Sequence, residues 1–256
     1  MENAADRDPW WTDWFGEEYL ACYPNRDDVE ARRHAASVSR RLFAAARVGR
    51  VPFLDLSCAT GRHAVVLSGA GRLAGIDGSL SLLREARHRE KVPAPGYLGG
   101  DQRRLPFRSA SFGAAVNFFP SLGTWESRAE DERALREVRR VLAPGGVFLS
   151  SHLNGERALS ALFTQQDKTV AGRRLSIRRR YRVDTGRLEK EISVCGGFGE
   201  KRFRQSVRVY ALADLRRLFL EAGFEEPEPT GDFDGSPFRP LRSPRLVLLA
   251  RRSAGT

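Results

Sequence analysis

The hydrophobic pattern of this chain switches repeatedly between short apolar runs and amphipathic stretches. Apolar runs of the kind found in buried strands lie at 51–57, 72–77, 96–99, 112–118, 146–152 and 243–251. Apolar positions with helical spacing lie at 26–48, 62–70, 79–90, 129–143 and 210–224. Strands that alternate with helices in this way predict an α/β fold with a doubly wound, mostly parallel sheet and right-handed crossovers.

Residues 155–208 show a different pattern, in which polar and apolar positions alternate. The alternation runs through 169–183, 186–194 and 201–209, with turn-forming residues at 184–186 and 196–199. We therefore expect antiparallel strands joined by hairpin turns. Arginines recur at alternate positions of these strands, namely Arg178, Arg180, Arg182, Arg204 and Arg208. They form either the solvated face of a half-exposed sheet or a wall that faces an anion, because guanidinium groups suit carboxylate and phosphate.

Acidic and small residues mark the ends of the predicted parallel strands. Asp55 lies in the first strand, and the loop after it contains small residues at 57, 59 and 61 before a helix begins. Such a loop lets a ligand approach the backbone and a helix N-terminus. Asp77 ends the second strand, where a carboxylate can accept hydrogen bonds from the hydroxyls of a ribose. Asp101 follows the third strand and either joins the other two acids at one sheet edge or forms a turn.

Five segments resemble, in the expected order, parts of the class I S-adenosylmethionine-dependent methyltransferases. The segments are 54–62, 75–79, 100–107, 112–118 and 135–149. The resemblance implies a Rossmann-like sheet of seven mostly parallel, doubly wound strands, with the antiparallel insertion as a substrate cover. It also implies an N-terminal helical lid at 1–48, a cofactor-binding core at 49–154 and 209–256, and the insertion at 155–208.

The cofactor loop departs from the pattern of this family. The usual loop is an acid followed by three glycines at alternate positions, and Ser57 and Ala59 replace the first two of them. A non-glycine residue held at positive φ costs on the order of 1 kcal/mol, and its side chain crowds the ligand. Asp55, Gly61 and Asp77 match the family, so cofactor binding is the favoured interpretation.

The resemblance implies a set of cofactor contacts. S-adenosylmethionine is the expected cofactor, with contacts from Tyr19, Asp55, Ser57, Ala59, Gly61, Arg62, Asp77, Gly78, Asp101, Gln102, Asn117 and Phe118. In this interpretation the carboxylate of Asp101 accepts from the adenine amino group, and the backbone of Gln102 serves the ring.

The substrate prediction rests on the loop 117–125, which resembles the segment bordering cofactor and substrate in a bacterial small-molecule branch of the family. The expected substrate pocket contains Phe15, Tyr23, Ser121, Trp125, Asn154 and Arg208. An apolar pocket with few polar groups is typical of a small-molecule site. His152 follows the fifth strand and is a candidate proton acceptor, with a structural role as the alternative. The aromatic segment 14–23 packs on the core, closes over the cofactor, or does both.

Composition narrows the partners and the location. The chain has 256 residues and a net charge of +11, and only four of its 43 basic residues are lysine. The arginines are spread along the chain, which favours a general compositional cause over a nucleic-acid surface. The three cysteines have no metal or redox spacing, and no apolar run reaches membrane-spanning length. With a polar, acidic N-terminus, these features predict a cytoplasmic protein without metal.

Transfer of a methyl group to an oxygen or nitrogen atom of a small molecule is the leading functional hypothesis. One alternative is the same fold repurposed for other chemistry or for binding, as the altered cofactor loop suggests. Another is a nucleic-acid methyltransferase, suggested by the net charge. Residues 117–120 lack the tetrad typical of enzymes that methylate base amino groups, which argues against that alternative. The pattern gives no indication of oligomeric state.

Overall fold

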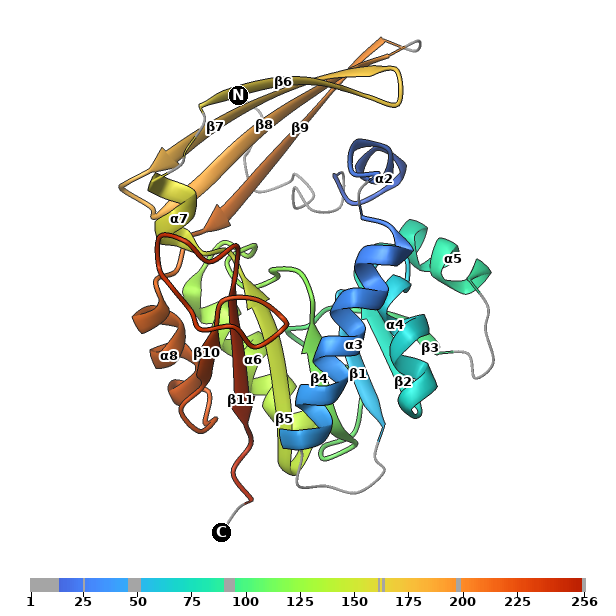
Figure 1. The fold of residues 1–256 in the computed structure, drawn as a ribbon, viewed down its shortest axis with the longest axis vertical. Helices are drawn as coiled ribbons and strands as arrows, with labels where there is room; N and C mark the ends of the chain where they lie inside the picture. The colour runs from blue at the N-terminus through green and yellow to red at the C-terminus, as the bar shows by residue number, and fades with distance from the viewer. Residues whose placement is uncertain are drawn as a thin grey trace.

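The computed structural model describes residues 14–24, 26–45, 52–89, 95–160, 162, 164–196 and 199–254. A seven-stranded sheet forms the core, and a four-stranded sheet lies beyond one end of its strands (Figure 1). The short helix α2 (Glu17–Cys22) lies between the core and the smaller sheet (Figure 1). Among the described helices, none has the length and apolar character needed to cross a membrane.

The core sheet is mostly parallel, as predicted. In sheet order its strands are β10 (Glu228–Thr230), β11 (Leu246–Arg251), β5 (Leu142–His152), β4 (Phe112–Asn117), β1 (Phe53–Leu56), β2 (Leu73–Asp77) and β3 (Gly96–Gly99). Strands β1 to β5 are parallel to one another, whereas β11 is antiparallel to β5 and to β10. Strand order reverses between β1 and β4, and open sheets of this kind bind ligands at that point, beyond the carboxyl ends of the strands.

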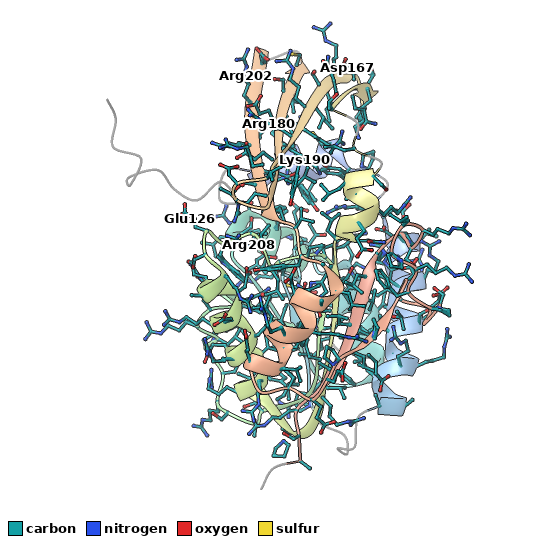
Figure 2. The ribbon with its side chains drawn as sticks, turned by 90° about the vertical axis from the view of Figure 1, so that its left-hand side faces the viewer. Glu126, Asp167, Arg180, Lys190, Arg202 and Arg208 are labelled. Carbon is teal, nitrogen blue, oxygen red and sulfur yellow. The ribbon has the colours of Figure 1, made fainter. Side chains whose placement is uncertain are left out.

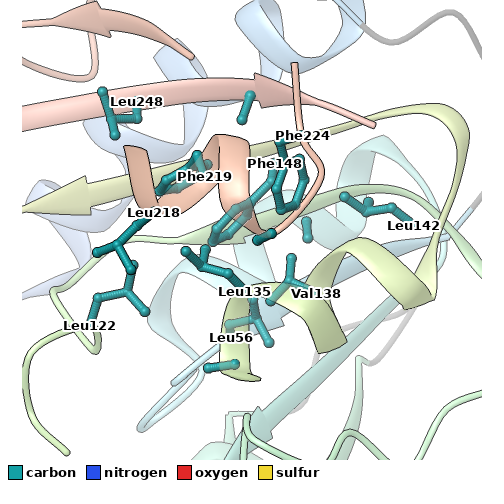
Figure 3. Packing of buried hydrophobic residues seen from close by; sticks show 14 of the residues in the cluster. Leu56, Leu122, Leu135, Val138, Leu142, Phe148, Leu218, Phe219, Phe224 and Leu248 are labelled. Atoms are coloured by element: carbon teal, nitrogen blue, oxygen red, sulfur yellow. The ribbon is translucent and has the colours of Figure 1, made fainter. Parts of the chain in front are cut away.

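Helices cover both faces of this sheet. One face packs against α3 (Asp28–Ala45) and α4 (Arg62–Leu67), which continues as the 3-10 turn η2 (Ser68–Ala70). The other face packs against α6 (Arg128–Val141) and α8 (Leu212–Glu221), where leucine and phenylalanine side chains interdigitate (Figure 3). Helix α5 (Leu80–His88) lies against β2 and β3 at the sheet edge.

The insertion between β5 and α8 contains one helix and an antiparallel sheet. Its elements are α7 (Gly155–Ser160), β6 (Gln165–Val170), β7 (Arg173–Arg182), β8 (Arg187–Gly196) and β9 (Gly199–Arg208). The single strand predicted at 169–183 is wrong, because the chain turns at Ala171 and Gly172, whose φ angles are 49° and 73°. Glycine favours such a left-handed turn, but alanine gives no turn signal in the sequence.

The two faces of the insertion sheet have opposite character. Leu175, Ile177 and Ile192 are buried on the inner face and pack with Trp14 and other side chains of the N-terminal segment. This segment therefore packs on the insertion, and its part before Trp14 lies outside the described residues. The arginines predicted at alternate positions lie on the outer face, where Arg178, Arg180 and Arg204 are exposed. Figure 2 shows Arg208 at the end of the sheet next to the core and Arg202 at the far end.

A buried carboxylate ties the loop after β4 to the chain that returns from the insertion. Asp131 accepts hydrogen bonds from the backbone N–H of Gly123 (2.6 Å) and from the hydroxyl of Tyr210 (2.6 Å). Burial raises the pKa of Asp131 to about 6. These two bonds fix the loop that borders the candidate site.

Candidate functional site

Two adjoining cavities lie where the core sheet, the insertion and the N-terminal helix meet. The strand-end cavity, with a volume of about 610 Å³, opens over the ends of β1 and β2 and over the loop after β3. The insertion cavity, with a volume of about 530 Å³, lies under the inner face of the insertion sheet. Both volumes are typical of small-molecule sites. The cavities share a junction formed by Phe15, Tyr19, Phe119, Pro120 and Thr124.

Most of the predicted site residues line these cavities. They are Phe15, Tyr19, Tyr23, Ser57, Ala59, Asp77, Gly78, Asp101, Gln102, Ser121, Trp125 and His152. The carboxyl ends of the strands thus gather the acids and small residues as the topology requires.

The loop after β1 holds two non-glycine residues in the left-handed region. Ser57 has a φ of 52° and Ala59 a φ of 48°, so the strain expected from the sequence is present. Hydrogen bonds support both residues: the Ala59 N–H donates to Asp77 Oδ2 (2.9 Å), and Gln102 Nε2 donates to Ser57 Oγ (2.6 Å). At Gly61 (φ 69°), a Cβ atom would overlap the ring of Tyr97, so only glycine fits there.

Asp77 faces the strand-end cavity from the end of β2. Its Oδ1 accepts from the Ser79 N–H (2.8 Å) and its Oδ2 from the Ala59 N–H (2.9 Å). Each carboxylate oxygen has a second lone pair, so the group can still accept hydrogen bonds from a ligand. Burial raises the pKa of Asp77, and the two backbone N–H donors oppose that rise.

A chain of hydrogen bonds crosses the floor of the same cavity. Gln102 donates through Nε2 to Ser57 and accepts at Oε1 from the hydroxyl of Ser121 (2.9 Å). The side chain of Gln102 thus fixes the positions of two cavity-lining loops. Asp101 lies beside it at the rim, where Arg103 binds its carboxylate and lowers its pKa against the opposing effect of burial.

Seven predicted site residues line neither cavity. They are Asp55, Gly61, Arg62, Asn117, Phe118, Asn154 and Arg208. Asp55 is buried behind the loop, and its Oδ2 has no hydrogen-bond partner among the described residues. Burial, followed by the charge of Asp77, raises the pKa of Asp55 well above its usual value.

Other predicted site residues outside the cavity linings make contacts within the protein. Arg62 donates to the backbone oxygen of Asp27 and to Glu30 on α3, so it faces away from the cavity. Asn117 donates to the Leu56 carbonyl of β1, and the ring of Phe118 stacks on His63 at 3.8 Å. Two residues predicted for the substrate pocket also have backbone partners. Asn154 donates to the carbonyls of Pro240 and Ser243, and Arg208 donates to those of Thr185 and Glu126.

His152 lines the insertion cavity at the end of β5. Its Nε2 lies 2.8 Å from the hydroxyl of Ser150. Burial lowers the pKa of His152 to about 3, so the ring is neutral in neutral solution. A pKa this low makes it a weak proton acceptor.

A group of basic side chains that was not predicted from the sequence lines the insertion cavity. They are Arg26, Arg179, Lys190 and Arg245. Arg179 has the same strand parity as Leu175 and Ile177, so its place on the inner face was readable from the alternation. The prediction instead followed the more numerous arginines of the opposite parity.

The strand-end cavity suits a cationic nucleoside in its charge and size. Asp77 and Asp101 are its only charged lining residues within the described part of the chain. An acid at the end of β2 suits ribose hydroxyls, and the cavity supplies apolar surface through Ile76 and Leu80. Its residues therefore fit S-adenosylmethionine.

Comparisons with known proteins agree with this geometry. Residues 54–150 match the methyltransferase domain family. An uncharacterized protein of Methanocaldococcus jannaschii is 34% identical over 101 residues, covering 40% of this chain and 36% of that protein. Malonyl-[acyl-carrier protein] O-methyltransferase of Erwinia pyrifoliae is 38% identical over 120 residues, covering 44% of this chain and 42% of that protein. The matched region thus spans less than half of either relative.

Structural similarity to solved methyltransferases extends over almost the whole chain. The CcbJ methyltransferase from Streptomyces caelestis superposes with a TM-score of 0.77 at 20% identity, covering 95% of this chain and 98% of that one. These matches confirm the predicted fold and the methyltransferase domain at residues 54–150. Two proteins of similar fold, CalS10 from Micromonospora echinaspora and the glycopeptide N-methyltransferase MtfA, were solved with S-adenosylmethionine bound and are each 22% identical to this chain.

Proposed function

We propose that this chain is a class I S-adenosylmethionine-dependent methyltransferase that transfers a methyl group to an oxygen or nitrogen atom of a small molecule. The observation that carries this proposal is the pair of cavities that meet at one aromatic junction. One cavity has the acids and loops suited to the cofactor. The other is a space of small-molecule size beside it, under the insertion sheet.

Methyl transfer depends on alignment of the two reactants and on exclusion of water, and it does not need a covalent catalyst. When bound, S-adenosylmethionine would supply the methyl group from its sulfonium: the bond between sulfur and the methyl carbon would break as the acceptor atom bonds to that carbon, and S-adenosylhomocysteine would leave. Asp77 would hold the ribose, and Gln102 and Ser121 would maintain the shape of the floor. Holding two reactants in line in a dry site supplies much of the rate enhancement.

Aromatic side chains close the junction. Phe15 and Tyr19 have ring centroids 5.1 Å apart, and Tyr19 and Tyr23 have centroids 5.2 Å apart. Their backbone is anchored by Trp14, which is buried against the insertion sheet. This arrangement supports the proposal that the N-terminal segment acts as a lid over the transferred group.

The acceptor loses a proton during transfer to a hydroxyl or an amine. His152 has too low a pKa to remove it from a hydroxyl before transfer. The neutral ring can accept a hydrogen bond and orient the acceptor, which is the role we propose for it. A neutral amine reacts by proximity and then releases its proton to solvent.

The strained loop at Ser57 and Ala59 favours one second candidate, a repurposed fold that no longer transfers methyl groups. Calorimetric titration with S-adenosylmethionine and S-adenosylhomocysteine separates the two. Methyl transfer predicts binding of both in about the micromolar range, followed by S-adenosylhomocysteine formation when small-molecule extracts are supplied as acceptors. Absence of binding to either compound would support the repurposed fold.

A further inference from the structure

We propose that the acceptor substrate carries an anionic group, a carboxylate or a phosphate, that Lys190, Arg179 and Arg26 bind in the insertion cavity. This inference rests on the proposed function, because it names the class of molecule that the same site takes. It depends on four observations about the basic side chains in that cavity.

The first observation is the charge of the lining. Four cationic side chains line the insertion cavity, and none of its described lining residues is an aspartate or a glutamate. A concave apolar site with charges of one sign concentrates ligands of the opposite sign. The neighbouring strand-end cavity has the reverse lining, with two acids and no basic side chain among the residues that the structure describes.

The second observation is that like charges face each other across two strands. Arg179 on β7 pairs directly with Lys190 on β8, and Gln205 on β9 pairs with Lys190 on its other side. Like charges at directly opposed positions destabilise a sheet. Burial, followed by the charges of Arg179, Arg26 and Lys168, lowers the pKa of Lys190 to about 8. An anion placed between the two cations would remove this repulsion.

The third observation concerns the partners of these cations. In the described part of the chain, the Lys190 ammonium has no hydrogen bond or ion pair, and the Arg179 side chain donates only to Gln166 Oε1 (3.0 Å). The Arg26 guanidinium lies over the rings of Phe119, Tyr23 and Tyr19, at 4.4, 4.8 and 5.1 Å from their centroids. Stacking leaves the edge of the guanidinium fork available for an anion. Arg245 differs, because Asp232 already pairs with it at 3.0 Å.

The fourth observation is the contrast with the outer face of the same sheet. There Arg182 pairs with Asp184, Arg202 with Glu200 and Arg204 with Glu189. Acids therefore accompany several basic residues where water already screens their charge, whereas in the described part of the chain no acid pairs with Arg179 or Lys190, where burial makes charge expensive. We expect the ligand to supply the negative charge that compensates these two cations. Leu188 and Val207 add apolar surface, so the anion is expected on a molecule with an apolar body.

Binding of small probes tests this inference. Phenyl phosphate, phenylacetate and the neutral 2-phenylethanol are titrated into the protein by calorimetry, in phosphate-free buffer with saturating S-adenosylhomocysteine. We expect at least one anion to bind about tenfold or more tightly than 2-phenylethanol. Preference between phenyl phosphate and phenylacetate then distinguishes a phosphate substrate from a carboxylate substrate.

Matched variants locate the anion site. Lys190→Gln and Arg179→Gln should each weaken anion binding by about tenfold and leave S-adenosylhomocysteine binding unchanged. Arg180→Gln removes the same charge from the next residue, whose side chain is exposed on the outer face, and should change neither. Both inner-face variants remove a repelling charge, so their melting temperatures should not fall and loss of binding cannot be ascribed to unfolding.

Two results would overturn the inference. One is an affinity for both anions no higher than that for 2-phenylethanol while S-adenosylhomocysteine still binds. The other is anion binding that Arg180→Gln weakens as much as Lys190→Gln does. A failure of S-adenosylhomocysteine to bind would instead count against the proposed function, and the anion titrations would then be read on the protein alone.

Discussion

The two cavities of this protein adjoin one another and carry opposite charges. Asp77 and Asp101 line the strand-end cavity, and four basic side chains line the insertion cavity, each without an opposing charge among the described lining residues. A sulfonium donor and an anionic acceptor would each enter the cavity of complementary charge. The separation of charge thus gives each cavity its own ligand and brings the two ligands together at the shared aromatic junction.

The cavities also store unfavourable energy in different ways. In the strand-end cavity the strain is conformational, because Ser57 and Ala59 have positive φ angles. In the insertion cavity it is electrostatic, because Arg179 and Lys190 oppose each other across two strands. A bound anion would relieve the electrostatic strain, whereas a glycine would relieve the conformational strain.

The largest effect is expected from Asp77→Ala. The substitution removes the carboxylate that lines the strand-end cavity and leaves the Ala59 and Ser79 N–H groups without their acceptor. Hydrogen bonds to a charged group contribute about 1.5–3 kcal/mol each, so affinity for S-adenosylhomocysteine should fall by about a hundredfold or more. Calorimetric titration measures the loss.

A matched control for that substitution is Asp184→Ala. Asp184 is exposed in a turn of the insertion, and its carboxylate pairs with Arg182, outside the lining of the strand-end cavity. The control should leave S-adenosylhomocysteine binding unchanged. Equal binding by Asp77→Ala and the unaltered protein would show that the cofactor does not use the end of β2.

The next effect concerns stability, and Lys190→Met should raise it. The folded-state pKa of Lys190, about 8, lies below the ordinary lysine value, so the folded state binds the Lys190 proton less tightly than the unfolded state does. Folding stability attributable to Lys190 is therefore lowest below pH 8 and rises as the pH increases from about 8 to about 10.5. Methionine keeps the apolar stem and removes the charge, which should increase the free energy of unfolding by about 2 kcal/mol at pH 7.

Urea unfolding at pH 7 and pH 10.5 checks this expectation. The gain should be present at the lower pH and small at the higher one. A loss of stability at pH 7 would mean that Lys190 has a stabilising partner. It would contradict the inference that electrostatic repulsion strains the insertion cavity. Arg180→Met on the exposed outer face should have little effect at either pH.

A smaller effect is the pH dependence of anion binding. Phenylacetate keeps its charge from pH 6 to pH 10, whereas Lys190 loses its proton in the free protein above about pH 8. Affinity should be constant below that value and fall by up to about tenfold over the next pH unit. Other titratable groups also line this cavity. Burial raises the pKa of Tyr23 and lowers that of His152 to about 3, so both stay neutral over this range. Burial also lowers the pKa of Arg26 to about 10, so Arg26 keeps its charge over the unit above pH 8 in which the affinity should fall. Lys190→Gln should abolish the dependence.

The positions of the acids at the strand-end cavity could be predicted from the sequence, because the topology of the sheet determines them. Parallel strands place their carboxyl ends at one edge, so Asp77 and Asp101 could be brought together from their positions alone. The orientation of the Asp55 side chain could not be predicted in this way. Alternation within a fully buried strand does not tell which side chain faces a ligand, and that of Asp55 lies behind the loop.

The lining of the insertion cavity was harder to predict, because it depends on which alternate residues of each strand face inward. A shift of one position exchanges the faces of a strand, and Arg179 and Arg180 differ by one position. The buried Leu175 and Ile177 carry the signal that assigns Arg179 to the inner face. Of the three aromatic rings under the Arg26 guanidinium, Tyr19 and Tyr23 are close in sequence, whereas Phe119 comes from a distant segment and its contact depends on tertiary packing.

The smallest effect should come from relieving the strained loop. Ala59→Gly removes a Cβ atom from a residue with a φ of 48°, and the lower left-handed cost should exceed the entropy added to the unfolded chain by about 0.5 kcal/mol. Ser57→Gly relieves the same strain but also loses the hydrogen bond from Gln102, worth about 1 kcal/mol, so its net effect should be zero or slightly destabilising. Urea unfolding of the two variants measures the difference. Equal destabilisation by both would show that backbone strain contributes little here, and that the two cavities differ in charge alone.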